Sequence, residues 1–192
     1  MATKSTLGNM VLCLTAVCLL CSAILGVIYV VTFDPIKAAA KANLETSLSE
    51  VVPEGCNVDT EADCREMEGV EYQCYKASDA QGNHCATVVS STVNGFGGSL
   101  TVLVGVMQDG TVCATKVLSH SETPGLGAKC EDGESAFVKQ FEGFDPAARK
   151  LAVKKDGGDV DAITASTITS RAYTLAIANA VKLLNKNEAD DE

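Results

Sequence analysis

Residues 100–118 read Leu-Thr-Val-Leu-Val-Gly-Val-Met-Gln-Asp-Gly-Thr-Val-Cys-Ala-Thr-Lys-Val-Leu, and this stretch decides the fold class. Its first part, Leu100–Met107, is rich in the β-branched residues that favour strands. Asp109 and Gly110 form a dipeptide typical of a tight hairpin turn. Thr111–Leu118 supplies the returning strand. The stretch therefore predicts a pair of antiparallel strands.

Further strands are predicted on both sides of this hairpin. Upstream, Val70–Tyr75 and Cys85–Val93 have strand character and are separated by a turn at Ala80–Asn83. Downstream, Lys150–Lys154 is predicted to form a short strand. Residues 53–69 are polar and acidic, and we expect them to be irregular.

Two helices are predicted after the hairpin. Glu134–Phe141 has helical spacing of its apolar residues, and a final helix is expected from Thr169 to about Leu184. The apolar face of that final helix has spacings of three and four, at Tyr173, Ile177, Ala180, Val181 and Leu184. The order of strands, helix, strand and helix predicts an α+β domain, a mainly antiparallel sheet with packed helices.

An uncharged segment precedes this domain. Leu7–Phe33 contains 27 residues without a charged side chain, whereas about 20 apolar residues suffice to span a bilayer. A cleaved signal peptide is the alternative, but its apolar region usually runs about 7–15 residues. A lipoprotein signal is disfavoured because Leu20, not a small residue, precedes Cys21. We therefore expect one retained transmembrane helix.

Charge and composition suggest how the chain is organised. The short N-terminal side carries Lys4 and no acidic residue, which favours a cytoplasmic N-terminus, although Lys37 and Lys41 weaken this signal. A second helix is expected to begin at Asp34-Pro35, where proline suits a first turn. The expected parts are a cytoplasmic N-terminus (1–6), a transmembrane helix (7–33), a stalk helix (34–52), an extracytoplasmic domain (53–186) and a mobile acidic tail (187–192).

The expected extracytoplasmic part is strongly acidic. Residues 34–192 hold all 25 acidic side chains and 14 of the 15 basic ones, which gives a net charge of −11. Such a domain repels nucleic acid and anionic lipid head groups. Nucleic-acid binding is therefore excluded, and the membrane is contacted through the helix.

Nine cysteines are present, and three of them lie in the uncharged segment. The other six are Cys56, Cys64, Cys74, Cys85, Cys113 and Cys130. Six cysteines in an exported domain permit disulfides, but the pairing does not follow from sequence. Free buried thiols are an alternative. Zinc is less favoured because no closely spaced pair such as Cys-x-x-Cys occurs.

The segment that precedes the final helix is rich in hydroxyl groups. Residues 161–170 read Asp-Ala-Ile-Thr-Ala-Ser-Thr-Ile-Thr-Ser. The free N–H groups and the partial positive charge of a helix N-terminus suit a phosphate. Ordinary helix capping is the alternative, but it needs one hydroxyl and this segment supplies five. From these residues alone, a phosphate-binding turn and an ordinary capped helix start both remain open.

A second distinctive segment follows the hairpin. Residues 122–127 read Glu-Thr-Pro-Gly-Leu-Gly, and its two glycines let the backbone approach a flat ligand closely. An ordinary Gly/Pro loop is the alternative. His84 and His120, the two histidines of the chain, lack a convincing metal-ligand neighbour in sequence, so we expect no metal site.

Together these motifs resemble those of the G subunit of the Rnf electron-transport complex, an FMN-binding family to which the C subunit of the sodium-translocating NADH:quinone reductase is related. The family pattern is Ser or Thr, Gly-Ala-Thr, any residue, Thr-Ser, and residues 164–170 here read Thr-Ala-Ser-Thr-Ile-Thr-Ser. Residues 95–98, Gly-Phe-Gly-Gly, and residues 122–127 match further family motifs. Ala165 and Ser166 replace the usual Gly and Ala. Because alanine disfavours a positive φ, we expect this turn to differ slightly.

The resemblance implies a covalently bound FMN, joined by a phosphoester to Thr167 by a separate flavin transferase that uses FAD as donor. It implies no catalytic residue and no metal. The residues that it implies around the FMN phosphate are Asp161, Thr164, Ser166, Ile168, Thr169 and Ser170, and those along the flavin ring are Glu122, Thr123, Gly125, Leu126, Gly127 and Lys129.

The resemblance also implies a function. The chain would relay electrons through FMN within an ion-translocating ferredoxin:NAD oxidoreductase in the plasma membrane, with the other membrane, flavin and iron–sulfur subunits as partners. The alternatives are the C subunit of the quinone reductase, or an anchored scaffold module without redox activity. The sequence contains neither a dinucleotide-binding glycine fingerprint nor iron–sulfur cysteine spacing, so binding of NAD or ferredoxin is assigned to other subunits.

Overall fold

The structure is a computed structural model, and it describes residues 6–190, with side chains up to residue 186. It divides into two compact units, one that ends at Asn43 and one that begins at Leu44. The predicted N-terminal segment 1–6 lies almost entirely outside the described residues, as do the last two residues of the predicted tail.

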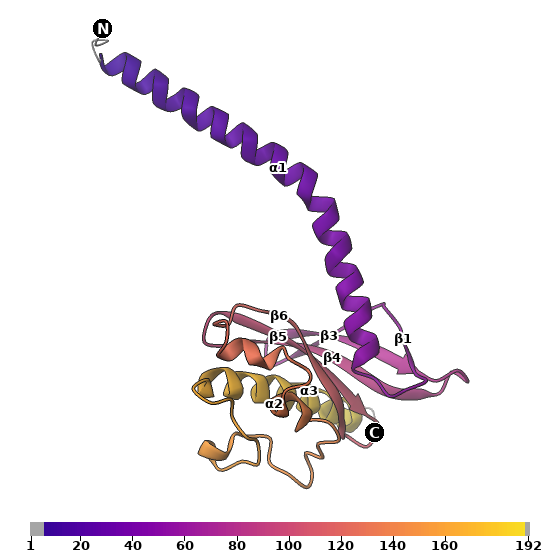
Figure 1. The fold of residues 1–192 in the computed structure, drawn as a ribbon. Coiled ribbons are helices and arrows are strands. Elements are labelled where there is room, and N and C mark those ends of the chain that lie inside the picture. Colours follow the sequence, from indigo (N-terminus) through magenta and orange to yellow (C-terminus); the bar gives the residue numbers. More distant parts are fainter. Residues whose placement is uncertain (1–5, 191–192) are drawn as a thin grey trace. The chain divides into compact units, whose positions relative to one another are not determined.

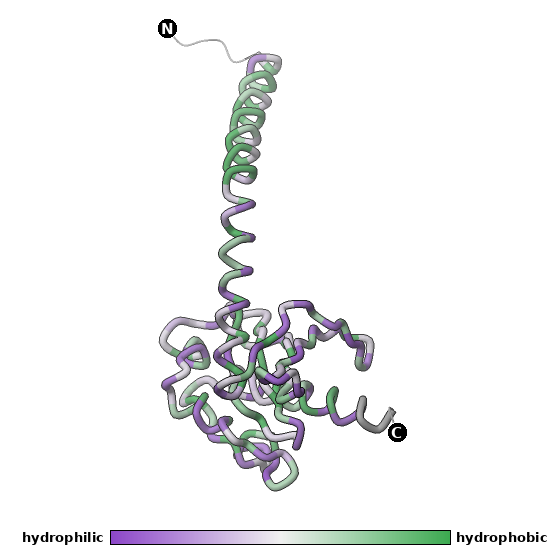
Figure 2. Tube along the Cα trace, turned by 90° about the vertical axis from the view of Figure 1, so that its right-hand side faces the viewer, coloured by the Kyte–Doolittle hydropathy of each residue, from purple (hydrophilic) through white to green (hydrophobic). Residues whose placement is uncertain are grey.

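The first unit consists of most of one long helix, α1 (Leu7–Glu50). Its N-terminal half is apolar, as the green part of the helix in Figure 2 shows, and it is long and apolar enough to cross a membrane. The structure has one continuous helix where two were predicted, because Pro35 lies inside α1 and not at a helix start. A proline within a helix removes a backbone hydrogen bond and tends to kink the helix at that point.

The second unit is built on an antiparallel sheet (Figure 1). Its main strands are β3 (Val70–Ser78), β4 (His84–Asn94), β5 (Ser99–Met107) and β6 (Val112–His120). The strand order is β1-β3-β4-β5-β6, and β2 also pairs with β3. The predicted hairpin is confirmed, since β5 and β6 pair around a turn in which Gly110 has a φ of 81°.

One face of the sheet is covered by the C-terminal helix α3 (Thr167–Asp190), together with the short helix α2 (Ala136–Lys139). Tyr173 lies at the centre of this core and packs edge-on against Phe137. Its hydroxyl donates a hydrogen bond of 2.7 Å to Thr115 Oγ1 on β6. The α+β prediction is confirmed, with the helices packed on an antiparallel sheet.

The other face of the sheet is covered by the end of α1 and the residues that follow it. Leu48 and Val51 are buried there against Val88 and Leu103. A Cβ atom on Gly105 of β5 would lie 1.8 Å from the carbonyl oxygen of Val51. A side chain at this position would therefore prevent the chain from crossing so close to the sheet. The C-terminal end of the predicted stalk is thus part of the second compact unit.

Several local predictions differ from the structure. The strand predicted at Lys150–Lys154 is wrong, because this segment forms a turn and a 3₁₀ helix, η2 (Lys154–Asp156), with a single bridge between Val153 and Val160. The helix predicted at Glu134–Phe141 is reduced to the single turn of α2. The segment expected to be irregular contains two short strands, β1 (Asn57–Val58) and β2 (Asp63–Met67). Helix α3 extends beyond its predicted range at both ends.

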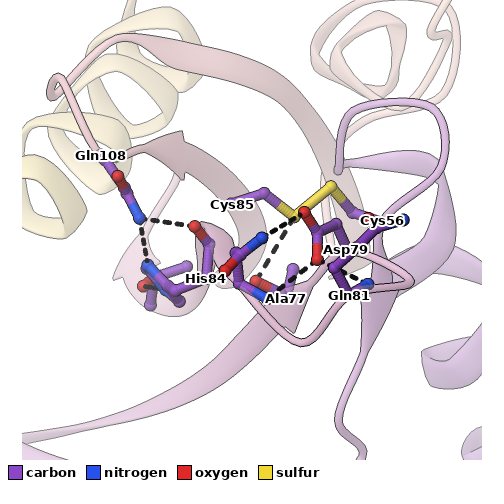
Figure 3. Close-up of a disulfide and its surroundings, with 9 residues drawn as sticks. Cys56, Ala77, Asp79, Gln81, His84, Cys85 and Gln108 are labelled. Carbon is purple, nitrogen blue, oxygen red and sulfur yellow. Dashed lines mark hydrogen bonds between the residues drawn. A yellow bond between two sulfur atoms is a disulfide. The ribbon is translucent and has the colours of Figure 1, made fainter.

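A disulfide joins Cys56, which precedes β1, to Cys85 in β4 (Figure 3). Beside it, Asp79 closes the turn between β3 and β4 by accepting hydrogen bonds from the backbone N–H groups of Gln81 and Asn83. The other cysteines of this unit are free thiols, namely Cys64, Cys74, Cys113 and Cys130. Among residues 6–190, no cluster of potential ligands could hold a metal ion. The cysteines thus occur as one disulfide and as free thiols.

Candidate functional site

A cavity of about 350 Å³ opens where three segments meet. These segments are the turn between β4 and β5, the loop after β6, and the first turn of α3. The lining residues are Phe96, Glu122, Thr123, Leu126, Gly127, Ala165, Ser166, Thr167, Ile168 and Thr169. The structure therefore brings all three sequence motifs to one place.

Glu122 fastens the three segments to one another. Its carboxylate accepts a hydrogen bond from the backbone N–H of Phe96 (2.7 Å) and another from the hydroxyl of Thr169 (2.9 Å). The side chain is buried, and a buried carboxylate is tolerated only when hydrogen bonds compensate for its lost hydration. The family resemblance implies that Glu122 lies along the flavin ring. Glu122 does line the cavity, and these hydrogen bonds give it a structural role as well.

Glycines make room for this carboxylate. A Cβ atom on Gly95 would lie 2.0 Å from Glu122 Oε1, and one on Gly127 would lie 2.6 Å from Glu122 Oε2. Gly97 passes equally close to the carbonyl oxygen of Ser121. For Gly127, the close approach that the sequence indicated is therefore made to the protein itself. Gly125, by contrast, has a φ of 76° and open space around its Cα.

The turn that leads into α3 has a left-handed residue. Ala165 has a φ of 62°, a left-handed conformation that glycine adopts more readily than alanine. The next backbone N–H, of Ser166, donates to the carbonyl oxygen of Ile163. The hydroxyl of Ser170 accepts from the N–H of Ile163 (2.9 Å) and donates to the carbonyl oxygen of Ser166 (2.9 Å). Ser170 is therefore a buried brace of the turn.

Thr167 begins α3 and is half-buried at the cavity wall. Its hydroxyl oxygen lies 3.1 Å from the ammonium nitrogen of Lys155. Around the same cavity, Phe96, Leu126 and Ile168 keep 67%, 44% and 51% of their surface exposed. The cavity therefore combines helix N–H groups and hydroxyls with exposed apolar side chains, and the cation of Lys155 contacts its wall at Thr167. This combination suits a ligand with one phosphate and one flat apolar part.

Sequence reasoning named thirteen residues for this site, and the structure distributes them unevenly. Those that line the cavity are Glu122, Thr123, Leu126, Gly127, Ser166, Thr167, Ile168 and Thr169. Those that lie outside its lining are Asp161, Thr164, Ser170, Gly125 and Lys129. Asp161 instead pairs with Lys154 at 2.7 Å.

Three further residues belong to the site. Phe96 and Ala165 line the cavity, and both lie within motifs that the sequence displays. Lys155 contacts Thr167 from a turn 12 positions earlier, and no motif marks this lysine. Lys155 reaches Thr167 only because the folded chain brings the turn at η2 next to the start of α3.

Two side chains beside the loop are engaged within the protein. His120 Nδ1 accepts a hydrogen bond from the N–H of Glu122 (3.1 Å), and its Nε2 lies 3.0 Å from a carboxylate oxygen of Glu131. Burial raises the pKa of the Cys130 thiol to about 11, and the charge of Glu122 contributes to this rise. Cys130 is therefore a protonated, unreactive thiol beneath the loop at neutral pH.

Comparison with known proteins agrees with this geometry. Residues 95–182 match the family model of the FMN-binding domain. The G subunit of the ion-translocating oxidoreductase complex of Cereibacter sphaeroides is 34% identical over 165 residues, which cover 83% of this chain and 75% of the relative. The protein of the same name in Vibrio atlanticus is 33% identical, covering 86% of this chain and 84% of the relative.

The fold and the cavity thus define a protein with an FMN-binding-type domain behind an N-terminal apolar helix. The chain belongs to the family of G subunits of Rnf-type ion-translocating oxidoreductase complexes. A solved structure, NqrC of Shewanella oneidensis, is 22% identical with a TM-score of 0.47, covering 60% of this chain and 61% of that chain.

Proposed function

We propose that this chain is the electron-transfer subunit of an Rnf-type complex and that it carries FMN bound covalently to Thr167. The proposal rests on one observation. The residues that line the cavity at the first turn of α3 all lie within the segment that matches the FMN-binding family model. When bound, FMN supplies a group that accepts and releases electrons. The surrounding residues must hold its phosphate, cover its ring system and keep the segments of the site in register.

Two parts of the cavity would bind the two parts of the cofactor. The hydroxyls and free N–H groups at the start of α3 would hold the phosphate, close to the oxygen of Thr167. Phe96, Leu126 and Ile168 would cover the apolar ring system and exclude water from one of its faces. Glu122 would keep the three segments in register through its two hydrogen bonds. A covalent bond would retain the cofactor where lost FMN could not be replaced.

The proposal includes partners. Because the relatives are named as subunits of a complex, we propose that the chain passes electrons to neighbouring membrane, flavin or iron–sulfur subunits. A flavin transferase would act on Thr167 during maturation. The apolar side chains at the cavity are exposed, so partner subunits would be able to approach a cofactor bound there.

The decisive experiment is coexpression of the full chain with a flavin transferase. We expect the denatured protein to give a fluorescent band under ultraviolet light, and its intact mass to exceed that of the polypeptide by one FMN less one water. Thr167→Ala should be dark and folded, since the side chain is only half-buried. A dark wild-type band would favour the scaffold alternative. An unchanged adduct on Thr167→Ala would move the attachment to Thr164 or Thr169.

The placement of the domain is also part of the proposal. An N-terminus in the cytoplasm, a single pass through the plasma membrane and an extracytoplasmic domain fit the disulfide between Cys56 and Cys85, because disulfides persist in oxidising compartments. The exposed Cys64 allows a test. A membrane-impermeant maleimide should label intact spheroplasts, and Cys64→Ser should lose most of this labelling. Labelling that requires lysis would reverse the orientation.

A further inference from the structure

The turn that carries Lys154 and Lys155 lies against the start of α3. Val153 bridges to Val160, and the 3₁₀ helix η2 is followed by Gly157, whose φ is 75°. Gly158 then passes the carbonyl oxygen of Ala152 so closely that a Cβ atom would lie 2.0 Å from it. This tight loop fixes the backbone positions of the two adjacent lysines.

The two lysines reach different partners. Lys154 Nζ donates to Asp161 Oδ2 at 2.7 Å, whereas Lys155 Nζ donates to Thr167 Oγ1 at 3.1 Å. The ammonium group of Lys154 is thus paired with a carboxylate. That of Lys155 hydrogen-bonds a neutral hydroxyl, the same hydroxyl that the proposed function assigns to the flavin, and its charge also helps to lower the pKa of the neighbouring Asp156.

An ion pair holds this turn in place. Arg171 lies one helical turn after Thr167 on α3, and its guanidinium makes two hydrogen bonds of 2.7 Å to the carboxylate of Asp156. These hydrogen bonds keep the pKa of Asp156 below its usual value. A two-pronged arginine–carboxylate pair fixes both distance and orientation. Since Asp156 directly follows Lys155, the pair holds Lys155 beside the first turn of the helix.

We propose that Lys155 assists flavin attachment at Thr167 and afterwards serves as the counter-charge of the phosphoester. This inference rests on the proposed function. Neither Lys155 nor Lys129, which sequence reasoning considered for this role, belongs to the cavity lining, but Lys155 is the lysine that hydrogen-bonds Thr167 Oγ1. The cations of Lys154 and Arg171 already have carboxylate partners.

The transfer step defines what Lys155 would contribute. The oxygen of Thr167 forms a bond to the FMN-side phosphorus of a flavin dinucleotide, and the bond from that phosphorus to the bridging oxygen breaks. AMP leaves with the electron pair, and the hydroxyl proton passes to a base in solution or on the transferase. An ammonium beside the threonine oxygen stabilises the negative charge that develops there. The product carries one negative charge on its phosphodiester, which Lys155 then neutralises.

The test measures the rate of flavin incorporation into the purified full chain by a flavin transferase, with FAD and Mg²⁺, as in-gel fluorescence. Lys155→Met should lower the kcat of attachment ~10-fold or more, by loss of a charge-assisted hydrogen bond, without a matching rise in KM for the acceptor chain. Lys155→Arg should recover much of this rate. The matched control, Lys154→Met, should stay within about twofold of the wild type, because exposed ion pairs contribute little.

The outcomes separate the two proposals. A wild-type chain that takes up no flavin overturns the proposed function together with this inference. Uptake by the wild type with equal rates for Lys155→Met and Lys154→Met overturns the inference alone. If Lys155→Met melts at a lower temperature than Lys154→Met, the attachment rates of Lys155→Arg and Lys155→Gln are compared instead. A slower rate for Gln than for Arg at equal melting temperature supports the role of the charge, and equal rates overturn it.

Discussion

Ala165 shows how one residue can keep a backbone conformation that its side chain opposes. Its φ of 62° lies in the left-handed region, where a Cβ atom costs about 1–2 kcal/mol relative to glycine. The turn nevertheless forms, because hydrogen bonds on both sides of it are satisfied. The surrounding structure, and not the residue itself, therefore determines this conformation.

Ala165→Gly should raise the free energy of unfolding by about 0.5–1 kcal/mol. Removal of the left-handed strain outweighs the added flexibility of the unfolded chain. Chemical denaturation measures the change. The matched control is the exposed Ala147, which lacks a positive φ, and Ala147→Gly should lower stability. The two substitutions are expected to change the free energy of unfolding in opposite directions. A destabilising Ala165→Gly would contradict the strain argument.

Glu122 joins the segments around the cavity through the hydrogen bonds of one side chain. Glu122→Ala leaves the N–H of Phe96 without its acceptor and should lower the free energy of unfolding by about 1–3 kcal/mol. Glu122→Gln should lose less, because an amide oxygen can still accept from Phe96 while its NH₂ donates to the Thr169 hydroxyl. Urea titration of both variants provides the measurement. A glutamine variant as unstable as the alanine variant would show that the negative charge itself is required.

At the scale of elements, alternation and turn chemistry predicted the sheet well. The β5–β6 hairpin and α3 follow from local sequence, since both have strong periodicity and clear end signals. The segment at Lys150–Lys154 was misassigned because its conformation depends on a bridge to Val160 and on the contact of Asp156 with Arg171. Such contacts between distant residues leave no local pattern.

The candidate site was predictable to the same extent. Its three motifs were visible as hydroxyl-rich and glycine-rich segments, and the cavity forms where they meet. The partner of Glu122 at Thr169, 47 positions away, was not visible. The approach of Lys155 to Thr167 was also hidden, because nothing local distinguishes Lys155 from Lys154. Motifs thus identified the segments, and tertiary packing set the roles within them.

The contact between the end of α1 and the sheet gives an element-scale prediction. Gly105→Ala places a Cβ atom 1.8 Å from the Val51 carbonyl oxygen, so the segment must move away from β5. We expect a loss of about 1–3 kcal/mol in the free energy of unfolding. Gly133→Ala, at a glycine with open space around it, is the control and should be nearly neutral. A neutral Gly105→Ala would mean that this packing contributes little.

At the scale of the whole second unit, the last residues of α1 cover one face of the sheet and α3 covers the other, and ionisable groups are enclosed in the core. Burial raises the pKa of the Cys74 thiol to about 11, and that of Cys130 to a similar value. Burial likewise raises the pKa of Tyr173. All three groups are protonated and neutral at physiological pH, so the interior tolerates them there.

These shifts predict loss of stability in alkali. Above pH 9 the unfolded chain releases thiol protons that the native state retains, so the folded form is progressively disfavoured as the pH rises towards 11. The slope is about 1.4 kcal/mol per pH unit for each such group. Urea unfolding at a series of alkaline pH values should show this decline. The double variant Cys74→Ala, Cys130→Ala should show a flatter one even if it is less stable at neutral pH, and an unchanged slope would assign alkaline unfolding to Tyr173 and the other buried tyrosines.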